Sequence, residues 1–262
     1  MRKYISLFFK FISLSWMREM EYRSNFITWM IIDFTWSAMD LLFMLVLINF
    51  TQVLGSWSKG QMLVVLGFFR IMVIPVWGWL FQSFSLIPKY ISEGMLDMIL
   101  TKPIDSQFMV SSRQFGFSII PSLFTGIGFT LYGFKILGMF PSPIFIIQFF
   151  WLAVVSTALI YGMYFATVAC TLYVERLNNI HHVFTSLYDA SRYPGDIFSP
   201  MLKRILTTLI PISLVIVIPA QSLFSSVKPF DFIYLHIITA VFLILSRRIW
   251  TNGLRHYSSA SS

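Results

Sequence analysis

Three charged residues, Asp33, Asp40 and Arg70, interrupt long apolar stretches of this sequence. A charge in the bilayer interior costs roughly 2.5–3.5 kcal/mol, so such residues usually pair with one another or face water. Asp40 lies nine positions before Asn49, and Arg70 lies nine positions after Gln61. Because their two apolar stretches are joined by a short polar segment, a common helical rise places both side chains at similar depth. We predict an Asp40–Arg70 pair that either fixes the helical hairpin or takes part in substrate passage. Asp33 is expected to reach interfacial water.

A second candidate site is the polar segment SEGMLDMILTKP at residues 92–103. Ser92 is expected to cap a short helix that Pro103 ends, with an acidic residue in its first turn. Such an amphipathic helix either docks into a groove on a soluble partner or lies on lipid headgroups. Its acidic side favours the protein partner, because anionic lipid would repel it. The residues expected to make the contact are Ser92, Glu93, Met95, Leu96, Asp97, Ile99, Leu100, Lys102 and Pro103.

The familiar motifs of catalysis and of nucleotide or metal binding are missing from the sequence. It contains no G-x-x-x-x-G-K-[ST] phosphate loop, no G-x-S-x-G and no H-E-x-x-H. The adjacent His181 and His182 would face different sides of a helix, and Cys170 is the only cysteine. We therefore expect a chain that is not an enzyme, binds no cofactor or metal, and has no disulfide framework.

The composition excludes a water-soluble globular domain. Hydrophobic residues make up 57% of the 262 residues and charged residues 11%, whereas a soluble domain has about 25% charged residues. The apolar stretches are continuous and do not alternate with period two, as the strands of a barrel would. An all-α bundle is therefore predicted, because each helix satisfies its own backbone in the membrane.

We expect one transmembrane domain of six spans, preceded by an interfacial helix. In residues 1–24 apolar side chains recur at helical spacing between basic ones, which is typical of an amphipathic helix on a membrane surface. A signal peptide is the alternative, but no A-x-A-like cleavage site follows. The other segments are spans at 26–50, 61–87, 114–138, 143–173 and 230–246, and a cytoplasmic tail at 247–262.

The position of the fifth span is open between two segments. It is either 205–224, which hydropathy favours, or the polar stretch 176–193, buried in the bundle interior. In the second case the proline-containing segment 194–224 would dip into the outer leaflet and return. Lys203 and Arg204 favour the first case, because positive charge concentrates on the cytoplasmic side.

The other basic residues orient the chain. Three segments hold most of them and should be cytoplasmic by the positive-inside rule, so both termini are predicted inside. The net charge of +8 follows from this bias and gives no reason to expect nucleic-acid binding. The residues are Arg2, Lys3, Lys10, Arg18 and Arg23 at the start, Lys89, Lys102 and Arg113 in loop 88–113, and Arg247, Arg248 and Arg255 in the tail.

Three segments, taken in order, resemble the permease subunits of bacterial type-2 ABC exporters, and in particular the subfamily called ABC-2 family transporter proteins. They are EGMLDMILTKPIDSQF at 93–108, RYPGDIF with the downstream IPISLVIVIPA within 192–220, and the tail RRIWTNGLRHYSSASS at 247–262. The tail is the most distinctive of the three. The resemblance extends over essentially the whole chain.

The resemblance implies an ATP-driven exporter in the bacterial inner membrane. A separate cytoplasmic ATPase dimer would bind ATP and Mg, and segment 92–103 would be the coupling helix that contacts it. A second permease, either a related chain or another copy, would complete the pore. A hydrophobic or amphipathic cargo would suit the Phe, Met and Trp residues of the first two spans, although lipid-facing helices have the same composition. The alternative is a self-sufficient secondary transporter or channel, which usually shows internal repeats or several converging ionisable residues.

The resemblance also bears on the fifth span, because this fold commonly has a re-entrant outer hairpin before the last span. That arrangement would place Tyr193, Pro194, Pro211 and Pro219 near an external gate. It would also place Lys203 and Arg204 outside, in conflict with the positive-inside count.

Overall fold

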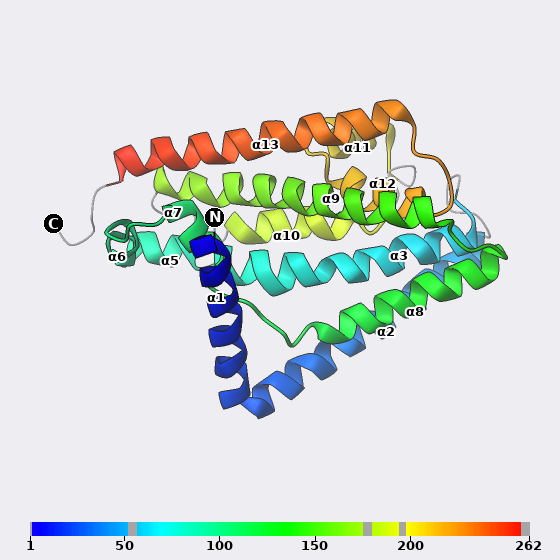
Figure 1. Cartoon of the computed structure of the whole chain (residues 1–262). Coiled ribbons are helices and arrows are strands. Elements are labelled where there is room, and N and C mark those ends of the chain that lie inside the picture. Colours follow the sequence, from blue (N-terminus) through cyan, green and yellow to red (C-terminus); the bar gives the residue numbers. More distant parts are fainter. Residues whose placement is uncertain (1, 52–56, 175–179, 194–197, 258–262) are drawn as a thin grey trace.

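The computed structural model describes residues 2–51, 57–174, 180–193 and 198–257, and every regular element in them is a helix (Figure 1). An all-helical fold is therefore confirmed. Helices α9 and α13 run side by side in one layer, and α3 packs along α8, with α2 behind α8, in the other (Figure 1). Helix α12 packs between α9 and α3. The short helices α5, α6 and α7 gather at one end of the bundle.

The first helix, α1 (Arg2–Glu21), lies across the direction of the long helices (Figure 1). Its apolar face packs on the bundle: the Phe8 ring lies 5.7 Å from the ring of Trp79 and 5.3 Å from that of Phe115, measured between centroids. The chain turns at Tyr22 into α2 (Arg23–Thr51). This arrangement fits an amphipathic helix at a membrane surface.

The most buried part of the bundle is a nearly continuous helical run from Lys59 to Ser92. It consists of α3 (Lys59–Val73), the π-helical stretch η1 (Ile74–Phe81), α4 (Gln82–Phe84) and α5 (Ile87–Ser92). Ser58 and Gln61 form a capping box at its start. The π-helical stretch begins beside Pro75, whose missing N–H removes one helical hydrogen bond.

Helix α8 (Ile120–Leu137) packs closely along α3 through glycines. A Cβ on Gly126 would lie 2.7 Å from the carbonyl oxygen of Gly67, and one on Gly133 would lie 2.7 Å from that of Gly60. Small residues at such crossings let two backbones approach, which provides much of the helix association energy in lipid.

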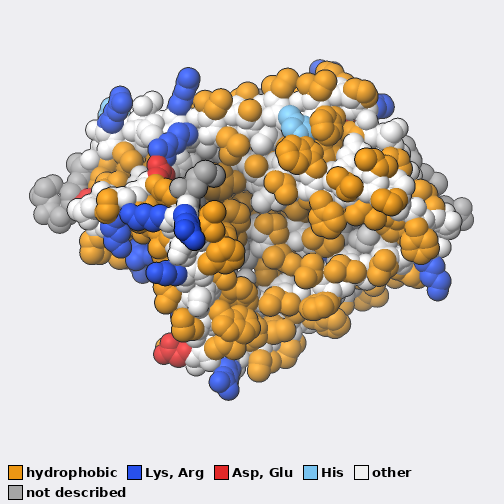
Figure 2. All heavy atoms as spheres, in the orientation of Figure 1, with side chains coloured by type: hydrophobic (Ala, Val, Ile, Leu, Met, Phe, Trp, Pro, Cys, Tyr) orange, Lys and Arg blue, Asp and Glu red, His pale blue; other side chains and the backbone are white. Residues whose placement is uncertain are grey.

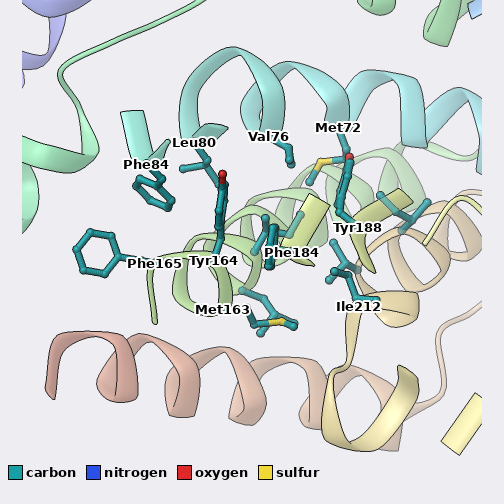
Figure 3. Packing of buried hydrophobic residues seen from close by; sticks show 14 of the residues in the cluster. Met72, Val76, Leu80, Phe84, Met163, Tyr164, Phe165, Phe184, Tyr188 and Ile212 are labelled. Carbon is teal, nitrogen blue, oxygen red and sulfur yellow. The ribbon is translucent and has the colours of Figure 1, made fainter. Parts of the chain in front are cut away.

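Helices α9 (Pro143–Ala169), extended by the 3-10 turn η2 (Cys170–Leu172), and α13 (Pro229–His256) form the other layer. The short helix α10 (Ile180–Ala190) lies against α9, with Phe184 stacked on Tyr164 at a centroid distance of 4.3 Å (Figure 3). Tyr188, from the next turn of α10, points to Phe69 and Met72 of α3 in the same core.

Five helices are long and apolar enough to cross a membrane: Arg23–Val46, Lys59–Ser92, Ile120–Leu137, Pro143–Leu172 and Pro229–His256. They correspond to the predicted spans other than the fifth. Two boundaries differ from expectation. Residues 112–119 are not helical, because the Gly116 N–H donates to the Gly78 carbonyl at 2.7 Å. Most of the predicted tail belongs to α13, which runs to His256, and residues 258–262 lie outside the described part of the chain.

Neither candidate for the fifth span is a continuous crossing helix within the described residues. Helix α10 has only 11 residues. The stretch 205–224 is divided into η4 (Ile205–Leu209) and α12 (Ile212–Ser222), which follow α11 (Pro200–Arg204). Pro211 has a ψ of 42° and cannot donate to the preceding turn, so the helix breaks there.

Candidate functional site

A cleft of about 880 Å³ lies between α2, the α3–η1 helix, the chain just before α8, and the end of α10. Its walls are largely aromatic, and its charged residues include three arginines and four carboxylates. The aromatic residues are Tyr22, Phe26, Trp29, Trp36, Phe69, Trp77 and Phe81, and the charged ones are Arg18, Glu19, Asp33, Asp40, Arg70, Asp189 and Arg192.

Arg70 of α3 is the centre of the charged group and is only 4% exposed. Its Nη2 donates to Asp33 Oδ1 at 2.9 Å and to Ser122 Oγ at 2.7 Å, and it also contacts Ser37 Oγ. Ser122 in turn donates to both carboxylate oxygens of Asp33, at 2.7 and 2.8 Å. Arg70 Nη1 reaches Asp40 Oδ2 at 3.4 Å. These contacts join α2, α3 and α8 into one polar junction inside an apolar bundle.

Asp40 is shared between two arginines. Its Oδ1 accepts from Arg192 Nη1 at 2.7 Å, closer than the contact with Arg70. Arg192, which follows α10, also donates from Nη2 to Asp189 Oδ1 at 2.9 Å, and its guanidinium carbon lies 4.9 Å from the centroid of the Phe69 ring. Asp40 therefore ties α10 to α2 and α3.

Helical spacing explains why α2 supplies so much of this site. Asp33, Ser37 and Asp40 are separated by four and three residues, so they lie on one face of the helix. Trp29 lies four residues before Asp33, and Trp36 lies four residues before Asp40. Both indoles are therefore on the same face of α2 and line the cleft. Alternating indoles and carboxylates thus form a stripe along α2.

The predicted Asp40–Arg70 contact is present, but it is the longer of the two that Arg70 makes to carboxylates. The expectation that Asp33 reaches interfacial water is wrong, because Asp33 is 9% exposed and is the closer partner of Arg70. Sequence reasoning missed Arg192, Asp189 and Ser122. The polar character of 176–193 was a signal for the first two, whereas a serine in an apolar stretch gives none.

The candidate coupling segment is arranged differently from the prediction. Helix α6 (Met95–Leu100) begins after Gly94, which has a φ of 69°. Ser92 does not cap it, because Ser92 ends α5 and donates its hydroxyl to the Lys89 carbonyl. Gly94 takes a left-handed conformation that other residues adopt at a cost, so the chain turns sharply between α5 and α6.

The apolar residues predicted for the contact are mostly turned inward: Leu96 and Ile99 are buried in the bundle, and Leu100 is 38% exposed. The most exposed apolar residue of α6 is Met98, at 65%, which is not among the residues predicted for the contact. Met95 and Asp97 are partly buried, and Glu93, Lys102 and Pro103 are exposed. Glu93 forms only a loose exposed pair with Lys89 at 3.9 Å. The outward face of α6 is therefore a small apolar tip centred on Met98.

The segment after α6 is tied to the end of α13. Asp105 Oδ2 accepts from Arg247 Nη2 at 2.6 Å, and Trp250 Nε1 donates to Ser106 Oγ at 3.0 Å. Asp105 also caps α7 (Ser106–Ser111) by accepting from the Phe108 N–H. Burial raises the pKa of Asp105, but the hydrogen bonds from Arg247 and Phe108 outweigh it and lower the pKa below its usual value.

The end of the described chain lies beside α6. Burial raises the pKa of Tyr257, and the neighbouring carboxylate of Asp97 raises it further. In α1, burial also raises the pKa of Glu19, which accepts from the Phe117 N–H at 3.0 Å.

The residues predicted for an outer gate lie on two segments, one just after α10 and the other at and within α12. Tyr193 packs edge-on against Phe43, with centroids 6.3 Å apart. Pro211 is at the start of α12 and Pro219 is inside it. Pro194 lies outside the described residues. In the described part of the chain no three His, Cys, Asp or Glu residues are grouped so as to hold a metal ion.

Five long apolar helices and a charged junction buried among them define a multi-pass membrane protein of the transporter class. A family model described as "ABC-2 family transporter protein" matches residues 34–261, and the chain belongs to this family. It is thus an ABC permease, a kind of membrane subunit that is generally not catalytic. No match was found among curated proteins or among solved structures. The match begins one residue after Asp33, so it includes Asp40, Arg70 and Arg192 but not helix α1.

Proposed function

We propose that this chain is the permease subunit of an ATP-driven exporter and that helix α6 couples it to a separate ATP-hydrolysing subunit. The observation that carries the proposal is the apolar tip of α6. Met98 is 65% exposed on a helix whose other side is anchored in the bundle. An exposed methionine on a rigid projection suits insertion into a groove of a soluble partner. ATP and Mg would be bound by that partner.

The distribution of charge supports a cytoplasmic position for this end of the bundle. Figure 2 shows Lys and Arg gathered at the end that holds α5, α6 and α7, beside a surface that is mainly hydrophobic. By the positive-inside rule this end faces the cytoplasm, together with both termini. The membrane would be the bacterial cytoplasmic (inner) membrane.

The sixth crossing would be made by α10 together with a re-entrant outer segment. Helix α10 follows η2, which contacts α5 at the cytoplasmic end, and α12 packs against α3, whose start lies at the opposite end (Figure 1). Residues 198–224 would then stay in the outer half, with Lys203 and Arg204 outside. Polar residues of α10 and of the segment after it would be shielded from lipid by their contacts with Asp40 and the core.

Two rigid connections would transmit movement of α6 to the membrane. One is the helical run from Lys59 to Ser92, whose end adjoins α6. The other is the Asp105–Arg247 pair with Trp250, which joins the segment after α6 to α13. ATP binding would favour one orientation of the helices only through a difference in affinity between two states. A second permease, either a related chain or a second copy, would complete the pathway.

A co-purification experiment tests this proposal. The chain is expressed with candidate ATP-binding subunits from the same genome, and the affinity of each for the chain is measured after purification. Replacing Met98 with Asp should weaken association about tenfold or more, as is typical of a buried interface anchor. Met201→Asp is the matched control, because Met201 is 76% exposed at the other end. Equal association of both variants and the native chain would refute the contact.

The alternative function is a self-sufficient secondary transporter or channel. Five charged residues converge in the bundle, whereas the sequence predicts convergence of only two. Such groups mark ion pathways in secondary transporters, so they favour this alternative. The residues are Asp33, Asp40, Arg70, Asp189 and Arg192. Solute movement by the purified chain alone in liposomes, without nucleotide, would establish it.

A further inference from the structure

We propose that the cleft between α2, α3 and α10 binds an amphiphilic organic cation, which gives the exporter its cargo class. The inference rests on the proposed function only for calling the ligand a cargo. Binding itself depends on the volume, the charge and the aromatic lining of the cleft.

The size of the cleft suits a small molecule. At about 880 Å³ it lies within the roughly 300–1,000 Å³ typical of ligand pockets. Such pockets combine apolar walls with a few polar groups that fix the orientation of the ligand. Here the apolar walls come from α2 and η1, and the charged group comes from α2, α3 and the end of α10.

The charge of the cleft favours a cation. The charged network contains three carboxylates, on Asp33, Asp40 and Asp189, against the guanidiniums of Arg70 and Arg192. The side chains of Asp33, Asp40 and Arg70 are at most 11% exposed, and Asp189 is the exposed member of the network. The other two charged lining residues, Arg18 and Glu19, have opposite signs, so the formal charge of the cleft is −1. In a largely apolar cleft within the membrane region, an uncompensated charge is costly, and a cationic ligand would relieve that cost.

Asp189 is the carboxylate whose negative charge is least compensated. Its Oδ1 accepts a hydrogen bond from Arg192 at 2.9 Å, but Arg192 also donates to Asp40 at the shorter distance of 2.7 Å. Its Oδ2 has no hydrogen-bond partner among the described residues, and the side chain is 45% exposed toward the cleft that it lines. Asp33 and Asp40 use both of their carboxylate oxygens within the network. An incoming cation would therefore meet Asp189 first.

The aromatic lining strengthens the preference for a cation with an apolar body. Trp29 and Trp36 alternate with Asp33 and Asp40 along one face of α2, and Trp77 faces the same cleft from η1. Indole faces attract cations and also bind apolar groups. An anionic ligand would find the guanidiniums of Arg70 and Arg192 already paired with carboxylates.

A pair of ions with the same shape and opposite charge tests the inference. The purified full-length chain in maltoside micelles is titrated with tetraphenylphosphonium or tetraphenylborate, and quenching of tryptophan emission is followed. Protein-free micelles dialysed against each ion provide the partition blank. The cation is expected to bind at least about tenfold more tightly than the anion. Equal affinities, or tighter binding of the anion, would overturn the inference.

Substitutions locate the binding. Asp189→Asn should weaken binding of the cation about fivefold, and Asp189→Glu, which keeps the charge, should retain it. Asp231→Asn removes a carboxylate far from the cleft and should have no effect. Trp36→Leu should weaken binding about fivefold, whereas Trp151→Leu should not, although both indoles are similarly exposed at 60% and 56%. Unchanged affinity in Asp189→Asn, or equal losses in a cleft variant and its control, would refute the site.

The outcome is separable from that of the proposed function. No ATP-binding subunit takes part in the titration, so a failure of α6 to bind that subunit would leave the result unchanged. Conversely, an absence of cation binding would leave the coupling role of Met98 intact.

Discussion

Exchanging the two charges of the Asp40–Arg70 pair should fail to restore stability. In an isolated ion pair, Asp40→Arg combined with Arg70→Asp would recover the interaction. Here an arginine at position 40 would face Arg192, whose Nη1 lies 2.7 Å from the present Asp40 carboxylate, and an aspartate at position 70 would face Asp33. Two like charges 4 Å apart at an effective dielectric of 20 repel by about 4 kcal/mol. The double variant should therefore be no more stable than either single variant.

The strength of each contact to Arg70 can be ranked from the structure. Asp33 Oδ1 lies 2.9 Å from Arg70 Nη2, and Ser122 hydrogen-bonds to both side chains. Asp40 Oδ2 lies 3.4 Å from Arg70 Nη1, and Asp40 is also paired with Arg192. A neutral double-mutant cycle of Arg70→Gln with Asp33→Asn should give a coupling energy of about 2–3 kcal/mol. The cycle with Asp40→Asn should give less than about 1 kcal/mol. Arg70→Gln alone should cost about 3–5 kcal/mol, because it leaves buried carboxylates unpaired.

Unfolding in mixed dodecyl sulfate micelles, followed by circular dichroism, measures these energies. Ser225→Ala, on the segment after α12, is a control outside the network. A larger coupling of Arg70 to Asp40 than to Asp33, or a full rescue by the charge exchange, would refute the shared network and restore a simple two-residue pair.

Three further predictions concern other parts of the bundle. Gly126→Leu should lower the thermal midpoint by several degrees or prevent folding, because a Cβ there would lie 2.7 Å from the Gly67 carbonyl oxygen. Gly128→Leu should leave the midpoint unchanged, because a Cβ at that position meets open space. Size-exclusion chromatography after heating distinguishes the two variants. The Asp105–Arg247 pair should stabilise the folded chain at pH values above the usual pKa of an aspartate, about 4. Because the folded-state pKa of Asp105 is lowered, this stabilisation is lost as the pH falls from about 4 through that pKa. The stability of an Asp105→Asn variant should therefore depend less on pH in an acid unfolding titration. Placing Pro at Gly94 should release α6 without loss of the bundle, which is seen as faster proteolysis between α5 and α7.

The sequence predicts the membrane bundle well because its signal is local. Long apolar stretches specify the five crossing helices. The sequence predicts a span from residue 114, but residues 112–119 are not helical, and Gly116 is hydrogen-bonded to Gly78, which is far away in sequence. The division of 198–224 depends on Pro211 and on packing against α3 and α9, and hydropathy contains no information on either.

The candidate site was predictable only in part. Helical spacing and depth place Asp40 near Arg70, and that contact exists. The closer partner, Asp33, is one heptad away, so distance along a single helix could not decide between the two. Arg192 reaches Asp40 across 152 positions of sequence, which no local pattern encodes. The α6 tip shows the same limit: spacing identifies an apolar side that includes Leu96, but tertiary packing buries Leu96 and leaves Met98, which is not on that side, exposed.

Site-directed photocrosslinking tests the central claim most directly. A photoreactive amino acid is placed at Met98 in the α6 tip, or at Phe140, which is 77% exposed between α8 and α9 at the opposite end. Cells of the native host that express the variant chain are illuminated, and crosslinked partners are identified by mass spectrometry. A nucleotide-binding protein with a phosphate loop should crosslink at position 98 and not at 140. Capture of that protein at 140, or at neither position, would contradict the account.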